Sequence, residues 1–73
     1  MFLGWFDDDK KYPTREKVTE AALRYQEKFH EMPRVVLCNP AHAEELPGLE
    51  FSLRLVEYIP KNTFYVGIEE GDA

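Results

Sequence analysis

The sequence predicts a small α+β domain, in which one long helix packs on one face of a sheet of three or four strands. Three observations predict it: an amphipathic stretch at Arg15–His30, a continuous apolar run at Arg34–Cys38, and two alternating segments within Phe51–Ile68. The expected order is a strand at the start of the chain, then helix, strand, short helix and a C-terminal antiparallel hairpin. All 73 residues form one domain in this prediction, with residues 69–73 as a frayed tail.

The N-terminal half supplies the first strand and the long helix. Aromatic residues favour extended structure in Phe2–Phe6, while Gly4 weakens it. Thr14 is a good N-cap for the helix that follows. Apolar side chains then recur at helical spacing and share one stripe: Val18, Ala21, Ala22, Tyr25 and Phe29. Leu23 lies well off this stripe, so we expect it to pack under the N-terminal aromatic residues or to face a second chain.

The middle of the chain predicts a buried strand and then a short helix. The unbroken apolar character of Arg34–Cys38 is typical of a strand covered on both faces. Asn39 is suited to cap a helix with Pro40 in its first position. We expect this helix to cover Ala41–Leu46 and to stop at Pro47-Gly48.

Two strands are expected in the C-terminal part. Apolar residues occupy every second position in both segments: Phe51, Leu53 and Leu55, then Phe64, Val66 and Ile68. The residues between Pro60 and Thr63 favour a turn, which predicts that the two strands form an antiparallel hairpin. We expect Arg34–Cys38 to lie beside one strand of this hairpin.

Composition limits the classes of function. The net charge of −5 disfavours binding to a nucleic-acid backbone, which needs clustered basic residues. No apolar run approaches the roughly 20 residues of a membrane span, so we expect no membrane association. The single cysteine, Cys38, excludes an internal disulfide and suits a cytoplasmic location. A chain of this length buries only about 60% of its unfolded surface, which favours support from a partner subunit.

Five apolar or aromatic residues are left over once the expected core is assigned: Trp5, Phe6, Leu23, Tyr58 and Tyr65. They predict a surface that contacts another protein or a second copy of the chain. The expected function is therefore a non-enzymatic protein–protein interaction module. We expect no cofactor and no metal site, because adjacent carboxylates such as those of Asp7–Asp9 cannot readily converge on one ion.

Two alternatives remain open, and the first is a binding module for a small anion or a nucleic acid. A helix start can bind an anion through free backbone N–H groups, which makes Asn39, Ala41 and His42 candidate anion contacts. Tyr58 and Tyr65 could instead stack nucleic-acid bases on one face of the sheet. The second alternative is an enzyme with Cys38 as nucleophile and His42 as base. No third residue that would orient the base is evident, so the sequence leans away from catalysis.

Overall fold

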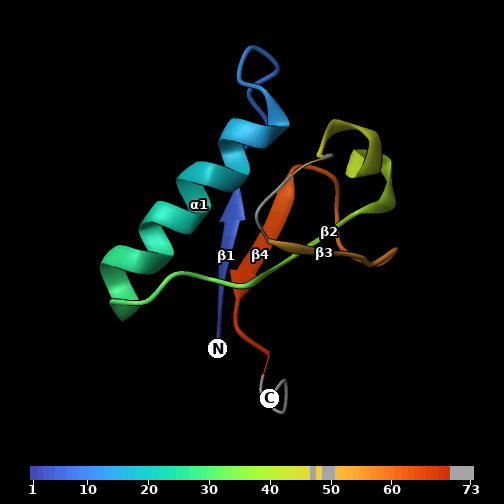
Figure 1. Ribbon diagram of the computed structural model, residues 1–73. Helices are drawn as coiled ribbons and strands as arrows, with labels where there is room; N and C mark the ends of the chain where they lie inside the picture. The colour runs from blue at the N-terminus through green and yellow to red at the C-terminus, as the bar shows by residue number, and fades with distance from the viewer. Residues whose placement is uncertain (47, 49–50, 70–73) are drawn as a thin grey trace.

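A mixed four-stranded sheet with one long helix against it forms the structure, a computed structural model that describes residues 1–46, 48 and 51–69 (Figure 1). The elements in chain order are β1 (Phe2–Phe6), α1 (Thr14–Phe29), β2 (Val35–Cys38), the 3₁₀-helix η1 (Pro40–Glu45), β3 (Ser52–Leu55) and β4 (Thr63–Gly67). The predicted α+β class is confirmed, and Phe2–Phe6 is a strand. Pro47 and residues 70–73 of the expected tail lie outside the described residues.

The expected C-terminal hairpin is wrong. The strand order is β1-β4-β2-β3, so β2 lies between β3 and β4. β4 is antiparallel to both of its neighbours, whereas β3 runs parallel to β2, with Val35 opposite Ser52. Period-two alternation specifies which face of a strand is buried, but it does not specify the neighbouring strand. The central place of β4 buries its apolar residues, and Phe64 and Val66 are fully buried there.

Helix α1 differs from its prediction at the start. Thr14 is the first helical residue rather than the cap, and extended Pro13 takes the N-cap position without a side-chain hydrogen bond. The Thr14 hydroxyl instead donates to the carboxylate of Glu45, 2.9 Å away. At the other end, His30 adopts a left-handed conformation and its N–H bonds to the carbonyl of Gln26.

The core lies between α1 and the sheet, on what we call the inner face. Its buried members are Val18, Ala21, Tyr25, Val36, Cys38, Leu46, Phe64 and Val66. Helix η1 lies over the same face, since the His42 ring packs 5.3 Å from the ring of Phe64 and Glu45 reaches the start of α1. The expected core residue Leu55 is 45% exposed. Among the described residues, no helix has the length and apolar character needed to cross a membrane.

Candidate interaction surface

Strand β1 forms one edge of the sheet, and all five of its residues are uncharged: Phe-Leu-Gly-Trp-Phe. Side chains alternate between faces along a strand. Leu3 and Trp5 are half-buried and pack against the core on the inner face. Phe2 and Phe6 therefore lie on the opposite, outer face, where both are exposed.

The backbone of β1 offers hydrogen-bonding groups at this edge. Met1 and Ile68 exchange two hydrogen bonds of 3.3 Å, and the Asp7 N–H donates to the Asn62 carbonyl at 3.0 Å. Hydrogen-bonded pairs recur at every second residue of an antiparallel ladder, so the odd-numbered residues of β1 direct their backbone groups at β4. The N–H and C=O groups of Phe2, Gly4 and Phe6 point away from β4. Within residues 1–46, 48 and 51–69, no strand pairs with this side of β1.

Two aromatic rings cover glycines on the outer face. Phe2 lies opposite Gly67, and Tyr65 lies opposite Gly4. A Cβ atom on Gly67 would come within 2.8 Å of Phe2 Cδ2, and one on Gly4 would lie 3.0 Å from Tyr65 Cε1. The glycines that weaken these strands by propensity thus leave room for the aromatic rings to approach the neighbouring strand closely. Phe2, Tyr65 and Phe6, which is 64% exposed, form the outer-face aromatic patch.

The five predicted interaction residues do not share one surface. Phe6 and Tyr65 share the outer face of the sheet, whereas Trp5 faces inward with the Arg24 guanidinium 6.0 Å from the centre of its ring. Leu23 lines a separate depression of about 330 Å³ beside α1. Tyr58 lies in the link between β3 and β4 and is 89% exposed. Phe2 also belongs to the outer-face aromatic patch, but it was not among the interaction residues predicted from the sequence. The signal was the alternation along β1, which places Phe2, Gly4 and Phe6 on the same face.

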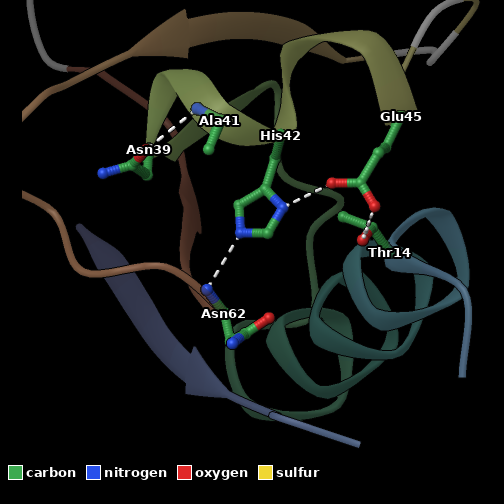
Figure 2. A network of polar contacts seen from close by, with 6 residues as sticks. All are labelled: Thr14, Asn39, Ala41, His42, Glu45 and Asn62. Atoms are coloured by element: carbon green, nitrogen blue, oxygen red, sulfur yellow. Dashed lines mark hydrogen bonds and ion pairs between the residues drawn. The ribbon is translucent and has the colours of Figure 1, made fainter. Parts of the chain in front are cut away.

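A polar network joins η1 to the start of α1 and to the turn before β4 (Figure 2). The Asn62 N–H donates to Nε2 of buried His42 at 2.9 Å. That nitrogen must then be unprotonated, so Nδ1 carries the proton and donates to Glu45 Oε1, 2.7 Å away. The hydrogen bonds from His42 and then Thr14 lower the pKa of the Glu45 carboxyl.

The groups that could have held an anion at η1 are engaged within the chain. The Asn39 side chain accepts from the Ala41 N–H at 2.9 Å, which confirms the predicted cap, and donates to the Ile59 carbonyl. The His42 N–H bonds to the Asn39 carbonyl, and both ring nitrogens of His42 are occupied. This arrangement does not favour an anion site at Asn39, Ala41 and His42.

The chemistry needed for a cysteine nucleophile is likewise not favoured. Cys38 is fully buried in the core. Burial, and then the negative charge of Glu45, raise the pKa of the Cys38 thiol. A nucleophilic cysteine needs the opposite, a stabilised and accessible thiolate. His42 has no free ring nitrogen with which to accept a proton. Among the described residues, no group of three or more His, Cys, Asp or Glu side chains could hold a metal ion.

Comparison of the chain with protein-family models, with curated proteins and with solved structures finds no match in any of the three. Function must therefore be inferred from the geometry of the described surface. The strongest feature of that surface is the free edge of β1 with the outer-face aromatic patch.

Proposed function

We propose that the protein is a protein–protein interaction module whose contact surface is the free edge of β1 with the outer-face aromatic patch. One observation carries the proposal: the outward backbone groups of Phe2, Gly4 and Phe6 belong to an edge strand that lacks the usual protection against pairing with another strand. Natural edge strands are commonly protected by charged residues, proline or bulges. β1 has no charged residue and no proline. The other edge strand, β3, carries Arg54, whose guanidinium lies 2.7 Å from the Glu69 carboxylate.

Such an edge binds a partner by strand addition. The partner's backbone bonds to the exposed N–H and C=O groups, and its alternate side chains meet those of β1 and so determine specificity. On β1 those positions are two exposed phenylalanines on either side of Gly4, above which the Tyr65 ring lies. An extended, apolar and aromatic segment is the partner that this pattern fits.

The experiment is an NMR titration of ¹⁵N-labelled protein with a peptide containing Phe-Leu-Gly-Trp-Phe between solubilising lysines. We expect the amide signals of Phe2, Gly4 and Phe6 to shift most. The same peptide with N-methyl groups at alternate residues should leave them in place, because it cannot complete the ladder. Shifts that are absent, or that N-methylation does not change, would overturn the proposal.

Two substitutions provide a matched pair for this titration. Phe6→Lys places a charge beside the edge and should weaken peptide binding. Tyr58→Lys adds the same charge at a more exposed aromatic residue in the link between β3 and β4, so it should leave binding unchanged. Equal effects of the two substitutions would indicate general electrostatics rather than binding at β1.

A further inference from the structure

We infer that the partner strand is β1 of a second copy of this chain, paired antiparallel about a two-fold axis that passes through Gly4. The inference rests on the proposed function and specifies its partner and register. The backbone groups that point outward belong to Phe2, Gly4 and Phe6, which are spaced symmetrically about Gly4. A strand with this symmetry is complementary to itself.

The register follows from the hydrogen-bonding pattern. With the axis at Gly4, Phe2 of one copy lies opposite Phe6 of the other, and the two Gly4 residues face each other. All three outward-facing residues then form reciprocal hydrogen-bonded pairs. A shift by one residue would place outward-facing groups opposite inward-facing ones. A shift by two would leave an outward-facing residue unpaired at the end of each strand.

The side chains favour the same register. Strands related by this axis keep their outer faces on the same side, so the Phe2 ring of each copy becomes the cross-strand neighbour of the Phe6 ring of the other. Aromatic cross-strand pairs stabilise antiparallel sheets. Near the axis neither Gly4 has a side chain, and each is covered by its own Tyr65 ring. Both exposed phenylalanines of β1 thereby gain a partner.

The two copies of α1 lie side by side without overlap in this arrangement. α1 packs over β1 and more extensively over β4, and strands are about 4.8 Å apart, so the two helix axes would lie about 10 to 14 Å apart, at or somewhat beyond the upper end of the usual packing distance. Figure 1 shows α1 running antiparallel to β1 along the sheet. The two copies of α1 would therefore be antiparallel to each other across the axis.

Charges on α1 are complementary between the copies. The Arg24 guanidinium lies over Trp5, and the Tyr25 hydroxyl donates to the Met1 carbonyl, so this part of α1 lies beside the middle of β1. Glu20 and Lys28 stand four residues to either side of Arg24. Antiparallel helices that cross near Arg24 bring Glu20 of one copy towards Lys28 of the other. Arg24 itself is neutralised within its own chain by Glu20, at 3.4 Å, and by Glu27.

Mixed cross-linking tests the register. Phe2→Cys and Phe6→Cys are made separately in a Cys38→Ala background and treated with a short bismaleimide, alone and as an equal mixture. We expect the mixture to form a covalent dimer severalfold more efficiently than either variant alone. Like positions lie four residues apart along paired strands in this register, about 13 Å, and opposite positions about 5.5 Å. Cross-linking of a single variant that equals the mixture would overturn the register.

If the cysteine variants do not fold, the unsubstituted protein can still be used to test dimerisation through β1. Sedimentation equilibrium up to about 1 mM protein should show a reversible monomer–dimer equilibrium. Isotope-filtered NMR of a mixed labelled sample should show contacts between the Phe2 and Phe6 rings of different chains. A monomer throughout, or a dimer without these contacts, would overturn the inference. If the β1 peptide still binds in that case, the proposed function stands with a different partner.

Discussion

Substitution of Glu45 tests the network that attaches η1 to α1. The carboxylate accepts one hydrogen bond from His42 and another from Thr14. Hydrogen bonds to charged groups contribute about 1.5–3 kcal/mol each. Half of the Glu45 side chain is exposed, so water replaces part of this, and we discount each bond to about 1 kcal/mol. Glu45→Ala should therefore lower the free energy of unfolding by about 2 kcal/mol, or Tm by about 10 °C.

The isosteric substitution separates charge from hydrogen bonding. In Glu45→Gln the amide oxygen can still accept from His42, and the amide nitrogen can donate to the Thr14 hydroxyl oxygen. Both contacts are kept, the second with its direction reversed, and the charge is lost. We expect a cost of about 1 kcal/mol or less, measured by urea unfolding. Glu44→Gln is the matched control, because Glu44 is an exposed carboxylate on the same short helix. If both glutamine variants unfold as the unsubstituted protein does, and Glu45→Ala with them, the network contributes no stability.

The lowered pKa of Glu45 also predicts how the free energy of unfolding changes with pH. The folded-state pKa of Glu45 lies below its ordinary value of 4.5, so in this range the unfolded state binds more protons and stability rises with pH. The stability supplied by the carboxylate is complete above the unfolded value and is lost as the pH falls through the folded value. The gap between the protein and Glu45→Gln should stay constant from about pH 7 to about pH 5.5 and then close in more acidic solution. A gap that persists unchanged to about pH 2 would refute this reasoning.

Three further predictions concern two glycines that neighbouring atoms approach closely and one buried thiol. Gly67→Ala should cost about 3 kcal/mol or more in urea unfolding, because its Cβ would lie 2.2 Å from the Met1 carbonyl oxygen, and β1 or β4 would have to shift. Gly4→Ala should cost less, because the new Cβ meets only the movable Tyr65 ring at 3.0 Å; an equal or larger cost would show that this ring is fixed. Cys38 should react with a thiol reagent only as fast as the chain unfolds, so fast labelling of the native protein would contradict its burial.

The elements of this fold could be predicted from sequence, but their pairing could not. The helical spacing of Val18 to Phe29 and the alternation of Phe64 and Val66 each describe a local surface that must be buried. Neither determines which strand lies beside which, and β2 separates β3 from β4 although no local pattern requires it. The free edge of β1 could not be predicted from the sequence either, because the direction of its backbone groups depends on its register with β4.

The polar network shows a second limit of local patterns. His42 and Glu45 are three residues apart on a short helix, so their hydrogen bond could have been foreseen. The acceptor role of His42 could not, because it depends on the N–H of Asn62, brought close only by the fold. Without that contact the sequence left His42 open as a base or an anion ligand. With it, both ring nitrogens are engaged in hydrogen bonds within the chain.

Stability and association are expected to be linked in this chain. The network at Glu45 joins elements on the inner face, and it meets β1 only past the end of the strand, where the Asp7 N–H bonds to the Asn62 carbonyl. The outward backbone groups of Phe2, Gly4 and Phe6 take no part in it. Partner binding to the folded state stabilises it by mass action, so dimerisation through β1 would make Tm rise with protein concentration. Glu45→Gln should lower Tm at every concentration and leave this slope intact, whereas Phe6→Lys should flatten the slope. The inner face would thus supply the stability of the single chain, and the outer edge the part that depends on a second copy.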